Sequence, residues 1–242
     1  MVSKNQIKLI NSLRQKKFRI SNNLFFAEGQ KVINELLQSD FELNYLYATE
    51  LAFNEFDVVK KTLVSQSELD KISALATSNS CLALFEIPKD KKNEITDLIV
   101  VLDDIRDPGN LGTIIRLCDW FGIRKIVCSQ ETVDVYNPKV VQATMGSIAR
   151  VALKYCDLVD FISKSELPVY GTFMDGANIY KTKLPSKAMI IMGNEANGIS
   201  EKIEKLIQNR IAIPRFGEIQ KTESLNVATA TAIILSEFRR DF

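Results

Sequence analysis

Short, mostly apolar runs, each followed by turn-forming residues, recur along the second half of this 242-residue chain. Runs of this length match strands that are buried on both faces, which carry few polar residues. Stretches with apolar residues at helical spacing separate them, so strand and helix alternate, as in a parallel sheet covered by helices. We expect the strands at residues 98–102, 123–128, 169–173, 188–192 and 211–213.

The helices between these strands are marked by their end residues. One helix is expected at residues 113–121, ended by Gly122. Another begins at Asn137, which caps it and is followed by proline at the first helical position. Ser200 is expected to cap a third, and the last helix is expected at residues 225–238.

The first part of the chain has shorter elements in a less regular order. Apolar residues at helical spacing precede and follow the first apolar run, which indicates helices on both sides of a strand. Strands are expected at residues 24–27, 45–48, 56–59 and 81–87, and a helix at residues 67–72.

A polar stretch that begins at Pro88 separates these two parts and is typical of a linker. The fold class is therefore α/β with two domains. We expect a small α/β domain over residues 1–87, a linker over residues 88–95 and a larger α/β domain over residues 96–242.

The chain contains no histidine, which limits its chemistry. Serine and cysteine hydrolases with a histidine base are excluded, as are zinc sites built on histidine. The four cysteines are widely spaced without a Cys-x-x-Cys pair, which is typical of reduced thiols and predicts no metal site. Neither a dinucleotide-binding glycine motif nor a P-loop is present.

No apolar run approaches the roughly 18 residues that span a bilayer. The first residues lack the apolar segment and small-residue site of a secretory signal. We therefore expect a cytoplasmic protein without a membrane partner.

Positive charge gathers near the N-terminus although the whole chain has a net charge of only +1. Residues 1–31 hold seven basic residues against the single acidic Glu28, a net charge of +6. Such a segment suits a phosphate backbone, and a solvated helix face is the alternative. The candidate RNA-binding residues are Arg14, Lys16, Lys17 and Arg19.

Three loops follow expected strands and carry glycine or asparagine at their turns: residues 110–116, 191–200 and 213–230. Glycine lets the backbone approach a ligand closely, and asparagine offers both a donor and an acceptor. Ligands on parallel sheets bind beyond the carboxyl ends of the strands. The three loops are therefore expected to form one composite site.

The motifs in these loops resemble those of the SpoU/TrmH-type family of the SPOUT methyltransferase superfamily. The resemblance runs from about residue 98 to the end, and residues 13–37 look like the substrate-binding domain attached to many of these enzymes. The matching positions are Asn110, Gly112 and Arg116 in the first loop, Gly193, Glu195 and Gly198 in the second, and Ile213, Pro214 and residues 224–227 in the third.

The resemblance implies a SPOUT domain with a deep C-terminal trefoil knot, preceded by a ribosomal-protein-like RNA-binding domain. It implies a homodimer whose active site is completed near the subunit interface. The methyl donor S-adenosylmethionine would be bound largely through backbone groups. Carried over to this chain, the cofactor-binding residues are Gly193, Gly198, Ile213 and Leu225.

The catalytic residues implied by the resemblance are Asn110, Arg116, Glu195, Ser224 and Asn226. The family mechanism gives the arginine the role of base, although a guanidinium stays protonated in almost any protein. Alternatively, Arg116 grips the target phosphate and hydroxyl, and the proton leaves through the phosphate or solvent. Helix capping is the alternative role for Ser224 and Asn226, and for Glu195 a favourable position at a helix N-terminus.

The leading hypothesis is a methyltransferase that uses S-adenosylmethionine to methylate a ribose 2′-hydroxyl of structured RNA. Ribosomal RNA is favoured over transfer RNA because of the attached N-terminal domain. The alternatives are transfer RNA as substrate, methylation of a base, and an RNA-binding protein that keeps the fold without catalysis.

Two further features bear on RNA contact. Trp120, Phe25 and Phe26 are expected in the core, with base stacking as the alternative, whereas Arg106 and Tyr136 are candidates for touching RNA. The segment between Pro214 and Ser224 is about three residues longer than in the commonest form of the family, and it leaves both flanking motifs intact.

Overall fold

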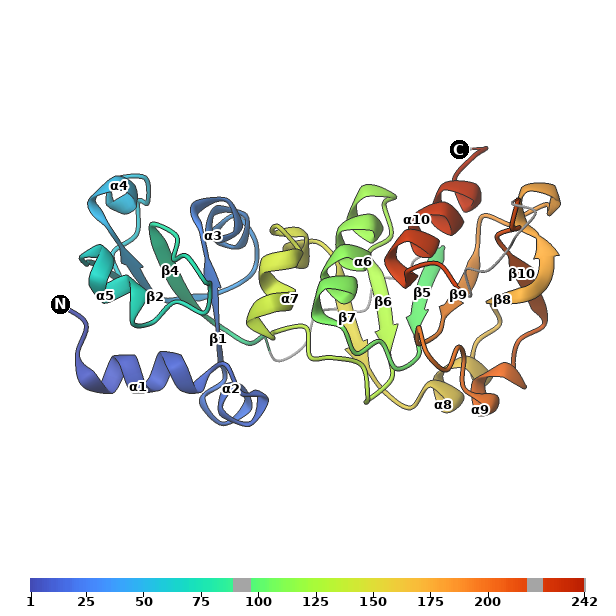
Figure 1. The fold of residues 1–242 in the computed structure, drawn as a ribbon, viewed down its shortest axis with the longest axis horizontal. Coiled ribbons are helices and arrows are strands. Elements are labelled where there is room, and N and C mark those ends of the chain that lie inside the picture. Colours follow the sequence, from blue (N-terminus) through green and yellow to red (C-terminus); the bar gives the residue numbers. More distant parts are fainter. Residues whose placement is uncertain (89–96, 217–223, 242) are drawn as a thin grey trace. The chain divides into compact units, whose positions relative to one another are not determined.

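The computed structural model describes residues 1–88, 97–216 and 224–241 of the chain (Figure 1). Its contacts divide the chain into two compact units. The first contains Met1–Lys92 and Asp134–Ala149, and the second contains Asn93–Val133 and Arg150–Phe242. Apart from Pro88, the predicted linker lies outside the described residues. The predicted domain boundaries stay a prediction.

The first unit is built on a four-stranded sheet in the order β1-β4-β2-β3. The strand β4 pairs antiparallel with both β1 and β2, and β3 runs parallel to β2. The strand bounds are β1 (Leu24–Glu28), β2 (Leu43–Ala48), β3 (Lys61–Leu63) and β4 (Cys81–Glu86).

The strand predicted at residues 56–59 is wrong, because β3 lies further along the chain at Lys61–Leu63. Phe56 is buried, but Val59 is fully exposed. Pairing with β2 begins at Lys60, whose carbonyl accepts from the backbone N–H of Leu46. A strand needs a neighbouring strand as well as apolar residues, and the sequence pattern gives only the residues.

Short helices cover this sheet. Ser65 forms a capping box with Glu68, so the helix predicted at 67–72 begins earlier, and Ser3 forms another capping box with Gln6. The helices are α1 (Lys4–Ser12), α2 (Lys16–Asn22), α3 (Gln30–Leu37), α4 (Glu50–Phe53), α5 (Gln66–Asp70), α7 (Pro138–Ala143) and the 3₁₀-helix η1 (Ser147–Ala149).

The segment Asp134–Ala149 joins the first unit through packing and charge. The ring of Tyr136 lies 4.8 Å from that of Phe25 and 6.5 Å from that of Phe41. Asp134 pairs with Arg19, whose Nη1 also donates to the carbonyls of Leu13 and Arg14. These contacts bury a charged pair, which is stable only when both partners are present.

The second unit contains a six-stranded sheet in the order β10-β8-β9-β5-β6-β7. All neighbouring strands are parallel, which confirms the predicted parallel α/β architecture. The strands are β5 (Leu98–Leu102), β6 (Lys125–Cys128), β7 (Ala152–Tyr155), β8 (Val169–Asn178), β9 (Ala188–Met192) and β10 (Asn209–Ala212). Two of them, β5 and β9, have the predicted bounds.

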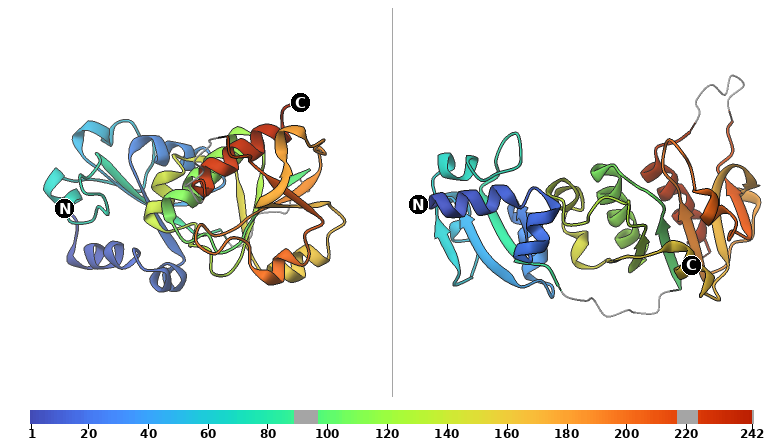
Figure 2. Two further views of the ribbon diagram at one scale, coloured as in Figure 1. Left: turned by 45° about the vertical axis from the view of Figure 1, so that its right-hand side comes forward. Right: turned by 90° about the horizontal axis from the view of Figure 1, so that it is seen from below.

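Helices cover both faces of this sheet. Ile99 and Val101 of β5 share a buried cluster with Leu158 of α8 and Ile203 of α9. Helices α6 and α10 pack side by side, and the views in Figures 1 and 2 agree on this (green and red). The helices are α6 (Pro108–Trp120), α8 (Leu158–Ser163), α9 (Glu201–Glu204), α10 (Val227–Phe238) and the 3₁₀-helix η2 (Ile179–Lys181).

Helix α6 begins five residues before its predicted start at residue 113. Asp107 caps it with a side-chain oxygen that accepts from the N–H of Asn110, and Pro108 occupies the first helical position. The first loop motif therefore lies within the helix, with Asn110 in its first turn. None of the described helices is long and apolar enough to cross a membrane.

The trefoil knot stays a prediction. The chain between β10 and α10 passes through residues 217–223, which lie outside the described residues. Helix α10 begins with the cap Asn226 and buries Ile234, Leu235 and Phe238.

Candidate functional site

Side chains from the three motif loops meet in one hydrogen-bonded chain. Asn226 Nδ2 donates to Asn110 Oδ1 at 2.9 Å, and Asn110 Nδ2 donates to Glu195 Oε1 at 2.5 Å. These residues come from the start of α10, the start of α6 and the loop after β9. The predicted convergence of the three loops is therefore found at Asn226, Asn110 and Glu195.

The donor-to-acceptor direction of these side-chain hydrogen bonds is fixed by Asn226, at the start of α10. Asn226 Oδ1 accepts from the N–H groups of Ala228 and Thr229 at 3.0 and 3.2 Å. Only Nδ2 of Asn226 is then free to face Asn110, so Asn110 presents Oδ1 to it and Nδ2 to Glu195. Asn226 thus caps its helix and also orients Asn110, while its catalytic role stays a prediction.

Gly193 and Gly198 close the second loop tightly. A Cβ atom on Gly193 would lie 2.3 Å from the carbonyl carbon of Gly198, and Gly198 has a φ of +67°. Residues 194 and 198 exchange two backbone hydrogen bonds of 2.9 and 2.8 Å. Both backbone groups of Gly198 are used within the loop, so the loop turn accounts for this glycine, which was predicted as a cofactor contact.

Asn194 anchors this loop to the end of β5. Its Nδ2 donates to the carbonyl of Asp104 at 2.7 Å, and its Oδ1 accepts from the N–H groups of Ala196 and Asn197. Because Glu195 is the next residue, these bonds fix the backbone that presents its carboxylate to Asn110. Sequence reasoning missed Asn194, although its place between two motif residues was a usable signal.

Two aspartates after β5 help to hold the loop that follows β9. Asp103 is 7% exposed, and its Oδ2 accepts from the N–H of Ser200 at 2.7 Å. Asp104 has a φ of 60°, an unusual value for a residue other than glycine. Its backbone N–H donates to the hydroxyl oxygen of Ser129 at 3.0 Å. Sequence reasoning assigned neither aspartate a role.

The positions predicted to hold the donor lie at strand and helix ends. Gly193 follows β9, Ile213 follows β10, and Leu225 precedes the cap of α10. In the sheet, β8 lies between β9 and β10 and pairs with both. Within residues 1–88, 97–216 and 224–241, the backbone groups of these three residues make no hydrogen bond to protein. They can therefore bind a ligand through backbone groups.

The structure does not bring Arg116 into this chain of side chains. Arg116 is exposed on α6, and it lies about 9 Å along the helix axis from Asn110. Six residues rotate it by about 240° around the axis, so the two side chains leave different faces. The described residues contain no hydrogen-bonding or ionic partner for Arg116.

Ser224 is exposed and does not cap α10, since Asn226 does so. No hydrogen bond joins Ser224 to the described part of the chain. The structure therefore places Ser224 beside Leu225 at the site without giving it a partner there.

The basic N-terminal residues fall into two groups. Lys16 and Lys17 are exposed at the start of α2, and Arg14 is exposed while its Nη2 donates to the carbonyl of Ser73 at 2.6 Å. Arg19 is only 2% exposed and is bound to Asp134. The prediction that Arg19 contacts RNA is wrong, because its buried guanidinium is bound to Asp134 and to backbone carbonyls inside the first unit.

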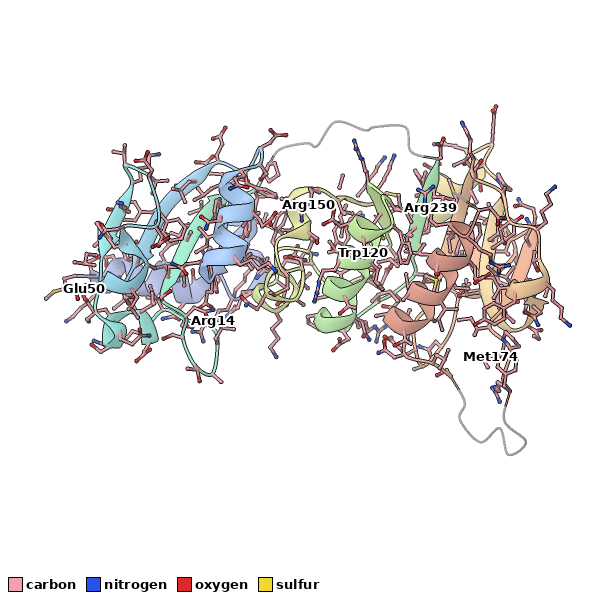
Figure 3. All side chains as sticks on the ribbon, turned by 90° about the horizontal axis from the view of Figure 1, so that it is seen from above. Arg14, Glu50, Trp120, Arg150, Met174 and Arg239 are labelled. Carbon is pink, nitrogen blue, oxygen red and sulfur yellow. The ribbon has the colours of Figure 1, made fainter. Side chains whose placement is uncertain are left out.

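The predictions for the aromatic residues were right for some residues and wrong for others. Phe25 and Phe26 are buried as predicted, but Trp120 is 84% exposed at the end of α6 (Figure 3). Tyr136, proposed as an RNA contact, is packed against Phe25, and burial raises the pKa of its phenol. The described residues contain no cluster of three or more His, Cys, Asp or Glu that could hold a metal ion.

Comparisons with known proteins find matches for both parts of the chain. Residues 97–236 match the SpoU rRNA methylase family, and residues 4–83 match the MRM3-like substrate binding domain. The chain is 27% identical to a 23S rRNA guanosine 2′-O-methyltransferase of Bacillus subtilis, over 98% of this chain and 97% of that protein.

Two solved structures extend the likeness to the whole fold. A TrmH-family protein of Porphyromonas gingivalis is 37% identical, with a TM-score of 0.91 and 100% of both chains covered. An rRNA methyltransferase of Sinorhizobium meliloti, solved with bound AdoMet, is 28% identical with a TM-score of 0.87. The alignment covers 100% of this chain and 97% of that one.

Proposed function

The chain belongs to the SpoU rRNA methylase family, and we propose that it transfers the methyl group of S-adenosylmethionine to a ribose 2′-hydroxyl of ribosomal RNA. The observation that carries this proposal is the hydrogen-bonded chain from Asn226 through Asn110 to Glu195, which joins the three motif loops. Its members are polar and oriented by one another; Glu195 and Asn226 are exposed and Asn110 is half-buried, as a site for a ribose and its phosphate requires.

The bound donor supplies an electrophilic methyl group on a positively charged sulfur. The backbone groups of Gly193, Ile213 and Leu225 would hold it, since they are unpaired within the described residues. Asn110 and Glu195 would orient the ribose. Holding two reactants in line accounts for about 7–11 kcal/mol of barrier reduction in favourable cases, which makes positioning the main task of these residues.

Arg116 serves the substrate as a cation in this proposal. A guanidinium that keeps its proton can bind the phosphate beside the target ribose and stabilise the hydroxyl oxygen while the hydroxyl proton passes to that phosphate or to solvent. A pH–rate profile tests this role. If Arg116 were the base, Arg116→Ala would abolish a pH-dependent limb of the wild-type profile, whereas loss of a binding group lowers the rate at every pH.

We also propose that the protein acts as a homodimer through the face of α6. Arg116 and Trp120 are four residues apart on one side of this helix, and both are exposed. Tryptophan and arginine are the residue types enriched in protein interfaces. A second subunit on this face would bring its Arg116 to the site of its partner. Trp120→Asp is expected to give a monomer in sedimentation, whereas Val159→Asp on α8 should leave the dimer intact.

A cytoplasmic location is proposed from the four cysteines, which are free thiols in the structure. The ribosomal RNA substrate is supported by the B. subtilis relative and by the match of residues 4–83 to a substrate binding domain. Transfer RNA stays the alternative substrate.

Methyl transfer from labelled S-adenosylmethionine to RNA tests the proposed function. Ribosomal RNA from cells that lack this gene is expected to accept label as a 2′-O-methylnucleoside, identified by mass spectrometry, and DNA is expected to accept none. Label on a base would overturn the ribose assignment. Donor binding without transfer to any RNA would favour a non-catalytic RNA-binding protein.

A further inference from the structure

Two aromatic side chains from distant parts of the second unit lie exposed beside one another. Phe216 is 83% exposed and Tyr180 is 39% exposed. Their ring centroids are 6.4 Å apart and their planes are tilted by 31°. Neither ring serves the core, and the chain of Asn226, Asn110 and Glu195 does not use them.

Tyr180 is presented by a well-anchored turn. It lies in η2, where Asn178 Oδ1 accepts from its N–H at 3.0 Å and the hydroxyl of Thr182 donates to the carbonyl of Asn178 at 2.8 Å. The preceding Ile179 is fully buried, and η2 contacts α10. The phenol ring is therefore held at the surface near the helix that carries Asn226.

Phe216 is tied to the proposed donor site by chain length. It follows Ile213 by three residues, which span at most about 10 Å. Phe216 and Tyr180 thus lie near the place where Ile213 would contact S-adenosylmethionine. The separation is roughly the length of one or two nucleotides.

Positive charge accompanies both rings. Lys181 follows Tyr180 and Arg215 precedes Phe216, and Lys183 lies two residues beyond Lys181; all three side chains are exposed. Alternation of aromatic rings with cations is typical of surfaces that bind single-stranded nucleic acid, where the rings stack on bases and the cations follow the phosphates.

We propose that Phe216 and Tyr180 form a stacking platform for an unpaired base of the RNA substrate beside the target ribose. Sequence-selective RNA recognition uses loops and bulges whose unstacked bases lie on aromatic side chains. This inference rests on the proposed function and adds a specificity-determining surface to it. The platform recognises a nucleotide next to the reaction, whereas the N-terminal unit would contact RNA elsewhere.

Steady-state kinetics with the full chain and ribosomal RNA from cells lacking the gene tests the platform. Phe216→Ala is expected to raise KM for RNA about tenfold or more, with little change in kcat or in the affinity for S-adenosylmethionine. Phe216→Leu keeps apolar bulk but has no ring on which a base can stack, so it should raise KM as Phe216→Ala does. Phe216→Trp keeps a ring and should have the wild-type KM. Met174→Ala removes an exposed apolar side chain from β8 and is the matched control (Figure 3).

Three results would overturn the platform. Phe216→Leu could match wild type, Phe216→Ala could weaken the binding of S-adenosylmethionine instead of RNA, or it could change the sedimentation of the protein. The second result would assign the pair to the donor and the third to a second copy of the chain.

Fluorescence separates failure of the platform from failure of the proposed function. In Trp120→Phe/Phe216→Trp the only tryptophan is at position 216. Ribosomal RNA should quench its emission if a base stacks on it, even when no methyl group is transferred. Unchanged emission under conditions where the RNA is bound would refute the platform.

Discussion

The basic N-terminal segment and the three motif loops show how differently neighbours and distant residues can behave. Lys17 is exposed, whereas Arg19, two residues later, is buried against Asp134. In contrast, Asn110 is 85 positions from Glu195 and 116 positions from Asn226 in the sequence, yet its side chain is hydrogen-bonded to both. A count of charges records residue types only. The motifs, in contrast, named in advance the three residues that meet.

Breaking the hydrogen-bonded chain is expected to have the largest effect. Asn110→Asp would put a second carboxylate at the 2.5 Å contact with Glu195. The two carboxylates would repel one another, and the amide N–H that donates to Glu195 would be lost. We expect kcat/KM for RNA methylation to fall by about 10²–10³-fold, the range seen when one positioned donor is removed from an active site.

Asn137→Asp is the matched control for this substitution. Asn137 caps α7, and aspartate caps helices as well as asparagine does. Its kcat/KM should stay within about twofold of wild type. Near-normal activity of Asn110→Asp, with normal folding, would show that the chain of side chains is not needed.

The second prediction concerns the buried charge in the basic segment. Asp134→Ala leaves the guanidinium of Arg19 unpaired, where its side chain is only 3% exposed. We expect the free energy of unfolding to fall by about 3–5 kcal/mol in urea titrations. Asp57→Ala removes an exposed carboxylate of the same unit and should change stability by less than about 0.5 kcal/mol.

A double replacement sharpens this prediction. Arg19→Met with Asp134→Leu removes both charges, so most of the lost stability should return. If Asp134→Ala is as stable as wild type, Arg19 has another anion or enough water, and its assignment as a structural residue is wrong.

The third prediction tests the exposed neighbours of Arg19. Lys16→Ala with Lys17→Ala should leave the free energy of unfolding unchanged but weaken RNA binding. If both lysines contact phosphates, the slope of log affinity against log salt should decrease by about 1.4–1.8. An unchanged slope would mean that this part of α2 is only a solvated helix face.

Much of the second unit could be predicted because local signals and the fold agree there. The bounds of β5 and β9 follow from uninterrupted apolar runs. In the first unit, the cap of α7 at Asn137 likewise follows from the asparagine and proline pair. The residues of the hydrogen-bonded chain were all named in advance. Their bonding order was not, since it depends on which amide atom caps α10.

Other features depend on contacts that sequence patterns do not encode. Trp120 was expected in the core, yet it is exposed, because the helical position fixes its direction and the residue type does not. Tyr136 was expected to touch RNA, and packing against Phe25 leaves it half-buried. The anchoring of Asn194 to Asp104 joins two loops through a backbone carbonyl, which leaves no mark in residue spacing.

The smallest expected effect compares two carboxylates, one in each unit. Glu195 is exposed, whereas Glu28 is 4% exposed and accepts from the hydroxyl of Ser73 at 2.5 Å and the N–H of Ala74 at 2.8 Å. Burial outweighs these hydrogen bonds and raises the pKa of Glu28 above its ordinary 4.5. The folded protein therefore holds this proton more tightly than the unfolded chain does.

The resulting stability contribution is fully present below pH 4.5 and is lost as the pH rises through the raised pKa of the folded state. Glu28→Gln cannot titrate. Relative to it, the free energy of unfolding of wild type should fall as the pH rises from 4.5 through the raised pKa of Glu28. Urea titrations at a series of pH values would measure the difference between the two proteins. If wild type instead became more stable relative to Glu28→Gln as the pH rises, the hydrogen bonds from Ser73 and Ala74 would prevail over burial, and Glu28 would be a charged anchor of the first unit.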